Sequence, residues 1–371
     1  MSSSIEDVEF EVIKEDVEKE ENGDEQIRQE NIELMIEIAH LCNRRDRSKV
    51  ENIFLLGKSG AGKSALVNTV IKVISGKYTP KAKVGAGGTQ SKTLNLERYK
   101  SCGVTREDIT DGTQRDLVQG ILPRLPTILD AAGKGDVNSE SLQEIIELLI
   151  GGYVPPGTSI EALEKLQKDY GVGSLKDVVY TECNPSWKVT KVVFVQSCRD
   201  VVPENLVECL HTVLKKTDPE TAKPLYTGDV YVVITKYDLV KSQSMYDCGS
   251  DDKTVSMSDF KAVETKIAEV FNIQGALEDN RIRWVSYTDR VSKDNPHIDN
   301  IALKFIRSMV RPVNQQETEH VKPVITNATK MKLEARKMWL SSNFNPSQFV
   351  LIVISIIVAF FLFKLFTAPL K

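Results

Sequence analysis

The segment VENIFLLGKSGAGKSALVNTV, residues 50–70, constrains the fold more than any other part of the chain. Its first half is an apolar run that is typical of a buried strand, and its second half has the periodicity of a helix. Between them stand glycines, which let backbone N–H groups converge on one point without obstruction from Cβ atoms. The turn matches G-x-x-x-x-G-K-[ST], and a strand before it and a helix after it are the context in which this pattern binds phosphate.

The residues of this turn have distinct predicted roles. Lys63 is placed to reach the β- and γ-phosphates of a nucleotide, and the Ser64 hydroxyl is placed to ligate Mg²⁺. The helix that follows adds the positive end of its dipole. The alternative is a glycine turn that binds nothing, which the strand–loop–helix context disfavours. The other predicted contacts to the nucleotide are Gly57, Lys58, Ser59, Gly60, Ala61, Gly62 and Ala65.

A second motif, TKYD in VYVVITKYDLV, follows an apolar strand pattern and indicates the base. Asp238 can accept hydrogen bonds from guanine N1–H and the 2-amino group, while the stem of Lys236 after Thr235 covers the ring. Adenine has no such pair of donors, so the Asp238 carboxylate would be left unpaired. Ser286 in RWVSYTD could offer its backbone N–H to guanine O6. The predicted ligand is GTP or GDP; a solvated Lys and Asp in an ordinary loop is the alternative.

The segment ILDAAGKGD supplies a candidate metal residue. Asp130 begins a D-x-x-G pattern and would hold Mg²⁺ through a water, while the Gly133 N–H would contact the γ-phosphate. In VGAGGTQSKT, either Thr89 or Thr93 could supply a second hydroxyl to the metal, and Thr89 is favoured because it directly follows the glycines. The alternative is a glycine loop with ordinary threonines. The predicted metal residues are therefore Ser64, Thr89 and Asp130.

Short apolar runs alternate with helical patterns along the chain, which predicts an α/β fold with a mainly parallel sheet covered on both faces. The predicted domain is a three-layer P-loop domain with a helical insertion. The insertion, residues 151–175, has a turn at Pro155-Pro156-Gly157 and a short helix after it. The predicted strands are 52–56, 93–99, 126–130, 191–196, 230–235 and 281–286, and the predicted helices are 63–74, 139–150, 203–215, 258–271 and 296–310.

The N-terminal region differs from this domain in composition. Residues 1–26 are dominated by Glu and Asp, which predicts a disordered acidic arm, with a docking tail as the alternative. From residue 26 the spacing of apolar residues predicts an amphipathic helix that packs on the domain, so that the domain and this helix span 27–310. The net charge of −4 and the scattered basic residues argue against a nucleic-acid partner. Six cysteines without a C-x-x-C pair favour a reduced, cytosolic setting.

The C-terminal region contains FVLIVISIIVAFFLF, residues 349–363, which has no charged residue. A helix continued to Phe366 is about 27 Å long, close to the thickness of a bilayer core. We therefore predict a transmembrane anchor at 346–367 that follows a basic linker at 311–345. A buried core helix is the alternative. Few residues follow this span, so a tail anchor in the endoplasmic reticulum or the mitochondrial outer membrane, with a cytosolic domain, is expected.

With these motifs, the chain resembles the TRAFAC-type P-loop GTPases and is most similar to the interferon-induced protein 44 family. The resemblance covers residues 50–310 and is carried by LLGKSGAGKSALVNTV, GAGGTQSKTLNLERY, ILDAAGKGD, IIELLIGGYVPPG and VVITKYDLV with WVSYTD. It implies a Rossmann-like domain that binds GTP, and an association with innate immunity.

Two positions depart from the usual GTPase pattern. Ala131 replaces the Thr of D-T-x-G, and Lys134 stands where small GTPases place a Gln that orients water. Hydrolysis is then expected to be slow or to borrow a residue from a second copy or a partner, and no catalytic residue is named. The predicted function is a membrane-anchored GTP-binding protein that hydrolyses GTP with Mg²⁺ to switch conformation or self-association. The alternatives are a GTP-binding scaffold without turnover, an ATPase with an accidental TKYD, and a membrane tether.

Overall fold

The computed structural model describes residues 5–47, 49–78, 82, 97–99, 107–121, 124–131, 133, 135–155, 157–176, 182–217, 222, 224–241, 254–271, 280–288 and 293–311. Its strands are β1 (Asn52–Leu56), β2 (Glu97–Tyr99), β3 (Thr127–Asp130), β4 (Lys191–Ser197), β5 (Asp229–Thr235), β6 (Val240–Lys241), β7 (Val255–Ser256) and β8 (Arg281–Arg283). Its α-helices are α1 (Ile5–Cys42), α2 (Lys63–Ser75), α3 (Gly112–Gln119), α4 (Glu140–Gly151), α5 (Ile160–Tyr170), α6 (Glu204–Leu214), α7 (Met257–Val270) and α8 (Pro296–Val310).

The main sheet has the order β2-β3-β1-β4-β5-β8 and is parallel except for β2, which pairs with β3 in the antiparallel sense. The predicted mainly parallel sheet is confirmed. In the register, Leu55 lies beside Asp130, and Ser197 lies beside Thr235. The carboxyl ends of β1, β3, β4 and β5 therefore meet at one edge of the sheet, where ligands of parallel α/β folds bind.

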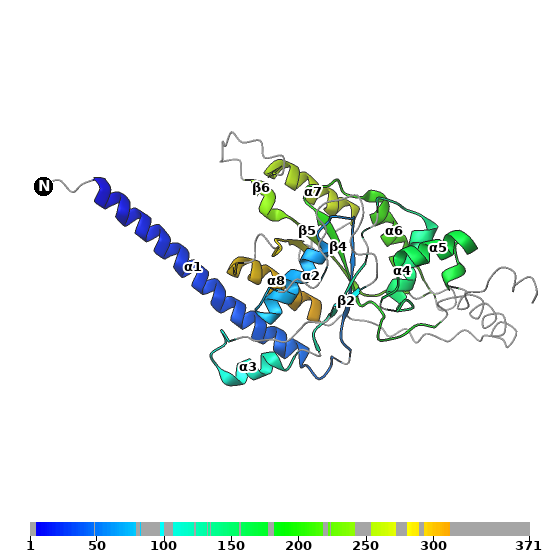
Figure 1. Cartoon of the computed structure of the whole chain (residues 1–371), viewed down its shortest axis with the longest axis horizontal. Helices are drawn as coiled ribbons and strands as arrows, with labels where there is room; N and C mark the ends of the chain where they lie inside the picture. The colour runs from blue at the N-terminus through cyan, green and yellow to red at the C-terminus, as the bar shows by residue number, and fades with distance from the viewer. Residues whose placement is uncertain are drawn as a thin grey trace, which may run out of the picture.

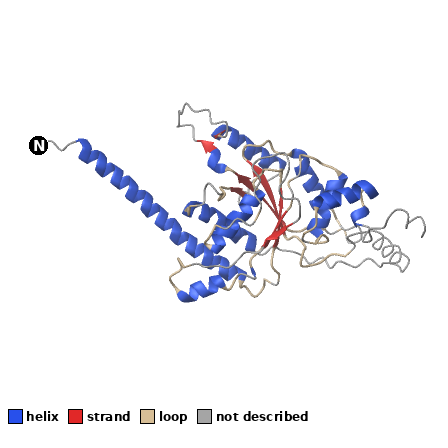
Figure 2. Cartoon of the chain, viewed as in Figure 1, coloured by secondary structure: helices blue, strands red, loops and turns tan. Residues whose placement is uncertain are grey.

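The sheet separates two hydrophobic clusters, so the domain has three layers (Figures 1 and 2). Successive residues of β1 point to opposite faces: Ile53 and Leu55 join the cluster of α1, α2 and α8, whereas Phe54 joins the cluster of α4, α5, α6 and α7. Strands that are buried on both faces have no polar side, which explains the continuous apolar runs in the sequence.

Helix α1 is longer than the predicted amphipathic helix. It is one helix over Ile5–Cys42, whereas residues 1–26 were predicted to be disordered, and its first part extends away from the domain (Figure 1). The segment has no proline and is rich in Glu, which is a good helix former, and this local preference competes with charge repulsion. The end of α1 packs along α8 and buries Leu34, Met35 and Ile38, as the periodicity predicts.

The other predicted elements agree with the expected ranges to within a few residues, apart from β2 and β8, and the short strands β6 and β7 and the helix α3 were not predicted. Helix α5 confirms the short helix of the insertion. Strand β8 ends at Arg283 rather than at residue 286, and β2 begins only at Glu97. Helix α3 was not predicted, because its sequence GTQRDLVQ buries only Val118 and has no apolar stripe to detect.

The C-terminal predictions fall on residues that the structure leaves undescribed. The linker from residue 312 and the predicted membrane anchor at 346–367 both lie outside the described residues. Among the helices that the structure does describe, none combines the length and the apolar character that crossing a bilayer requires.

Candidate functional site

The glycine-rich loop from Gly57 to Gly62 connects β1 to α2 at the carboxyl edge of the sheet. Gly60 and Gly62 have φ values of 80° and 98°, a left-handed conformation that residues with a Cβ rarely adopt. At Gly57 a Cβ would overlap the carbonyl oxygen of Val195 on the adjacent strand β4. The glycines of the motif are therefore required by the fold of the loop as well as by access to a ligand.

Lys63 is the first residue of α2, and its side chain turns back over the loop. Its Nζ donates hydrogen bonds of 3.1 Å to the carbonyl oxygens of Gly57 and Lys58. The side chain is buried, and burial lowers the pKa of Lys63 to about 8, while the nearby carboxylate of Asp130 opposes this shift. Among the described residues the hydrogen-bond partners of Lys63 are neutral carbonyl groups, and a buried cation with such partners favours the approach of an anion.

Ser64 and Asp130 come together, although 66 positions separate them in the sequence. The Ser64 Oγ donates a hydrogen bond of 2.8 Å to Oδ2 of Asp130, which is fully buried at the end of β3. A hydroxyl beside a carboxylate provides the hard oxygen donors that Mg²⁺ prefers. Two of the three predicted metal residues, Ser64 and Asp130, are thus adjacent, whereas the third, Thr89, and its alternative Thr93 lie outside the described residues.

Gly133 lies against the glycine-rich loop. A Cβ on Gly133 would be 2.5 Å from the backbone nitrogen of Ser59, so only glycine allows this approach. The D-x-x-G segment therefore contacts the loop that was predicted to hold the phosphates. Ala131 is buried beside it, and Lys134 lies outside the described residues.

The TKYD segment is tied to the same loop. Thr235, the last residue of β5, donates a hydrogen bond of 2.6 Å from Oγ1 to the carbonyl oxygen of Ala61. Lys236 has a φ of 63°, which costs a residue with a Cβ about 1–2 kcal/mol. Its Nζ donates to Ser197 Oγ at 3.2 Å. The left-handed residue turns the chain into a short 3₁₀ helix, Tyr237–Leu239, in which Asp238 is exposed.

The loop after β8 lies beside the TKYD segment. The backbone N–H of Trp284 donates to the Ile234 carbonyl at 2.8 Å, and the N–H of Tyr237 donates to the Trp284 carbonyl at 3.2 Å. The indole N–H of Trp284 also donates to Ser286 Oγ at 2.9 Å. The two segments that were predicted to read the base are therefore neighbours that share backbone hydrogen bonds.

Sequence reasoning missed the residues at the end of β4. Ser197 accepts the hydrogen bond from Lys236, and the thiol of the buried Cys198 donates to the Lys236 carbonyl oxygen at 3.2 Å. Burial raises the pKa of Cys198, which keeps the thiol protonated. These residues follow the apolar run KVVFVQ, and their position after a central parallel strand was the signal that could have found them.

Comparisons with known proteins give a limited result. No protein-family model and no curated protein sequence matches the chain. Solved structures that are similar to it include Toc33 from Arabidopsis thaliana in complex with Mg²⁺ and GMPPNP, at 14% identity and a TM-score of 0.36, covering 75% of this chain and 90% of that one. Toc33 with GDP and Mg²⁺ and a dimerization-deficient Toc33 mutant each have 13% identity and a TM-score of 0.35, covering 75% and 89%. A likeness of this extent does not establish a shared function.

Proposed function

We propose that this protein is a P-loop GTP-binding protein that holds GTP or GDP together with Mg²⁺. The observation that carries the proposal is the hydrogen bond from Thr235 to the Ala61 carbonyl, which joins the TKYD segment to the glycine-rich loop. A nucleotide has its phosphates and its base at opposite ends. A site for it therefore needs the segment that binds the phosphates and the segment that binds the base on the same edge of the sheet. That edge here has a buried lysine at one end and the two base-reading segments at the other.

The phosphate end would act through charge and backbone. The Lys63 ammonium would exchange its two carbonyl partners for phosphate oxygens, and the amides of the glycine-rich loop would donate to the same oxygens. Ser64 and Asp130 fit a magnesium site, and the ion would neutralise charge on the β- and γ-phosphates. Gly133 would sense the γ-phosphate because it already contacts Ser59.

The proposed reaction is transfer of the γ-phosphoryl group to water. Because Lys134 stands at the position of the usual Gln, this chain would orient the water poorly by itself, and a second copy or a partner would supply the missing group. Thr89 would be the second hydroxyl ligand in this scheme. The second candidate is a scaffold that binds GTP without turnover, which the same Lys134 and Ala131 favour.

Guanine recognition is tested with Asp238→Asn in the full-length protein. The Asn amide keeps one oxygen that can accept from N1–H, but its NH2 group faces the 2-amino donor of guanine, whereas it can donate to the 2-oxo group of xanthine. We expect GTP affinity to fall about tenfold or more and XTP to become the preferred ligand. The measurement is competition against a fluorescent guanine nucleotide, with ATP as a further competitor. Asp229→Asn at the opposite edge is the control, and ATP competing as well as GTP would contradict the proposal.

Hydrolysis is tested by phosphate release from the full chain in detergent, beside Lys63→Ala. A rate of phosphate release that is higher in the wild type than in Lys63→Ala supports a GTPase. Equal rates in the two proteins contradict the hydrolysis proposal and favour the scaffold that binds GTP without turnover. Self-association that depends on the nucleotide is part of the proposal, because a bilayer confines anchored proteins to two dimensions. A protein that stays monomeric with a non-hydrolysable GTP analogue in liposomes contradicts it.

Membrane attachment through 346–367 and the resemblance to the interferon-induced protein 44 family also belong to this proposal, together with a cytosolic domain at the endoplasmic reticulum or mitochondrial outer membrane. The support is the uncharged run at 349–363 and the basic residues before it, Lys330, Lys332, Arg336 and Lys337. Deletion of 346–371 is expected to release the protein from the membrane fraction. If the deleted protein stays in the membrane fraction, the assignment of 346–367 as the anchor is wrong.

A further inference from the structure

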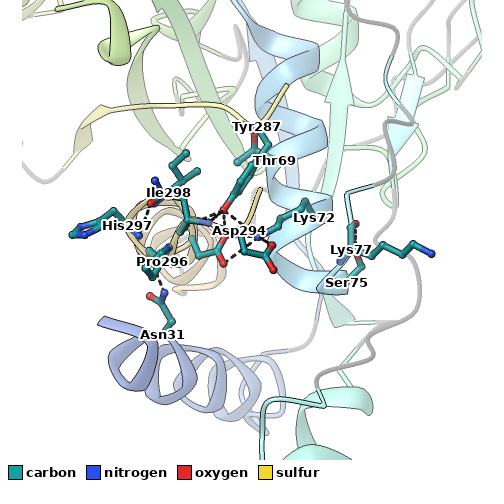
Figure 3. A network of polar contacts seen from close by, with 12 residues as sticks. Asn31, Thr69, Lys72, Ser75, Lys77, Tyr287, Asp294, Pro296, His297 and Ile298 are labelled. Atoms are coloured by element: carbon teal, nitrogen blue, oxygen red, sulfur yellow. Dashed lines mark hydrogen bonds and ion pairs between the residues drawn. The ribbon is translucent and has the colours of Figure 1, made fainter. Parts of the chain in front are cut away.

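A buried polar network lies beside the base-reading loops and joins four elements (Figure 3). Its centre is Tyr287, which directly follows Ser286 in the loop after β8 and is fully buried. Lys72 reaches it from α2, Asp299 from α8, and Asn31 of α1 lies at the far side. None of these residues was assigned a role by the nucleotide motifs.

The backbone of Tyr287 is anchored to the helix that begins in the glycine-rich loop. Its N–H donates a hydrogen bond of 2.9 Å to Thr69 Oγ1, and that hydroxyl donates at 2.9 Å to the Ala65 carbonyl one turn earlier in α2. The residue after Ser286 is therefore held at a set distance from the phosphate end of the site.

The hydroxyl of Tyr287 is anchored to α2 and α8. It accepts from Lys72 Nζ at 3.1 Å and from the Asn295 N–H at 2.9 Å, and it lies 2.8 Å from Asp299 Oδ1. Burial, and then the Asp299 carboxylate, raises the pKa of Tyr287 to about 12, so the hydroxyl keeps its proton and can donate as well as accept. A Phe could fill the same volume, but it could not hold these partners.

Lys72 and its carboxylates complete the network. Burial disfavours the charged form of Lys72, but Asp299 and Asp294, each 2.9 Å from its Nζ, hold the pKa above its ordinary value. The charge of the buried Lys72 is thus paired, and removing Asp299, whose side chain is 19% exposed, is destabilising, whereas Asp294 is 69% exposed. The Lys72 Nζ also lies 4.2 Å from the centroid of the Tyr287 ring, which restricts the ring further.

The network reaches α1 through the first turn of α8. Asn31 donates from Nδ2 to the Pro296 carbonyl at 2.8 Å and accepts from Asn300 Nδ2 at 3.0 Å. Pro296 follows Asn295, whose backbone N–H binds the Tyr287 hydroxyl. The position of the loop after β8 is therefore shared among α1, α2 and α8.

We propose that Tyr287 is a positioning residue for guanine specificity: it holds the Ser286 backbone N–H where guanine O6 is to be read. The inference rests on the proposed function, because it needs a guanine nucleotide in the site. Loops that carry recognition groups must be held rigidly for a hydrogen bond to discriminate between bases. Two independent anchors on one residue, at the backbone and at the hydroxyl, meet that need.

The test compares three nucleotides in the full-length protein by competition against a fluorescent GDP. In 6-thio-GTP a sulfur replaces O6, so this ligand reports on the Ser286 N–H, since sulfur is a weak acceptor. ITP lacks the 2-amino group and reports on Asp238. We expect Tyr287→Phe to reduce the preference for GTP over 6-thio-GTP roughly threefold or more, and to leave the preference for GTP over ITP unchanged.

A matched control separates positioning from general loss of stability. Tyr226 is another buried tyrosine, and its hydroxyl lies 3.0 Å from the Asp229 carbonyl at the opposite edge of the sheet. Tyr226→Phe is expected to keep both ratios. Thr69→Val, which removes the other anchor of Tyr287, is expected to reduce the 6-thio-GTP ratio and serves where Tyr287→Phe folds poorly.

The outcomes separate this inference from the proposed function. A wild-type protein that binds no guanine nucleotide overturns both. A wild-type protein that binds GTP with Asp238-dependent selectivity, while Tyr287→Phe and Thr69→Val keep its GTP to 6-thio-GTP ratio, overturns the role of Tyr287 alone. A reduced ratio in these variants but not in Tyr226→Phe supports it.

Discussion

Two buried lysines stand at opposite edges of the same sheet. Lys63 lies at the carboxyl edge, and Lys191, the first residue of β4, lies at the amino edge. Both side chains are buried, and burial lowers the pKa of each to about 8. By burial and by pKa the two residues are nearly equivalent, although we assign a ligand to only one of them.

The difference lies in their partners. Lys191 donates hydrogen bonds of 2.8 and 2.9 Å to the carbonyl oxygens of Ser308 and Arg311, and so satisfies the C-terminal end of α8. Lys63 donates to carbonyl oxygens of its own loop. An anion can replace these carbonyl oxygens as the partners of Lys63 without removing a hydrogen bond from the end of any helix. A perturbed pKa therefore marks a candidate site only when the partners of the group can be exchanged for a ligand.

The largest expected effect separates the two lysines by ligand binding. Lys63→Met removes the cation at the phosphate end, and we expect GTP affinity to fall about 100-fold, the loss of one strong charged hydrogen bond. The free energy of unfolding without nucleotide should not fall, because a buried charge with weak partners is removed. Titration calorimetry and urea unfolding measure the two quantities. Equal GTP affinity in the variant would break the comparison.

Lys191→Met should show the opposite pattern. The carbonyl oxygens at the end of α8 lose their donor in a buried position, so the free energy of unfolding is expected to fall by about 2 kcal/mol. GTP affinity of the folded protein should stay within about twofold of the wild type, because the residue lies at the far edge. A loss of affinity without a loss of stability would contradict this assignment.

A third prediction uses pH. Both lysines have a folded-state pKa near 8 and an ordinary value of 10.5. As the pH rises between these values, the folded state loses protons that the unfolded state still binds, so each lysine makes stability rise with pH. Urea unfolding at about pH 7 and about pH 9.5 should show a smaller rise in each Met variant than in the wild type.

The same pH window distinguishes the lysines by ligand. Phosphate oxygens favour the charged form of Lys63, so GTP binding above pH 8 should take up a proton and weaken as the pH rises. Calorimetry in two buffers of different ionisation enthalpy measures this uptake. The Lys191→Met variant should keep this proton uptake, and the Lys63→Met variant should lose it. Proton uptake that persists in Lys63→Met contradicts the assignment of Lys63 as the lysine that binds phosphate.

The smallest expected effect concerns Asp229, whose Oδ2 lies 3.9 Å from Lys191 Nζ. Its side chain is 42% exposed, so solvent screens the pair. Asp229→Asn is expected to lower the free energy of unfolding by less than about 1 kcal/mol, far less than Lys191→Met. A larger loss in urea unfolding would show that the ion pair, rather than the cap of α8, holds Lys191.

Much of the fold could be predicted because each signal was local. The apolar runs at β1, β4 and β5 and the periodic helices α2, α4 and α8 lie within a few residues of the expected ranges. Helix α3 could not be predicted, since it lies on α1 and buries one residue. The length of α1 was missed because like charge argued for disorder, while the absence of proline allowed a continuous helix.

The candidate site divides in the same way. The glycine-rich loop and the TKYD motif are each one unbroken stretch of sequence. Their residue types and spacing therefore already indicate a phosphate and a base. The role of Tyr287 could not be predicted, because its partners Thr69, Asn295 and Asp299 come from α2, from the residue before α8 and from α8. The contact of Gly133 with Ser59 likewise depends on the register of β1 and β3.

By itself the sequence determined the main strands and helices in their order along the chain, the glycine-rich loop and the candidate residues, since these depend on periodicity and on backbone freedom within short segments. Only the tertiary structure decided which of two buried lysines faces exchangeable partners, and which tyrosine holds the loop of Ser286. The physical reason is that hydrogen bonds across the sheet and between helices join residues that are far apart in the chain, and no local pattern records them.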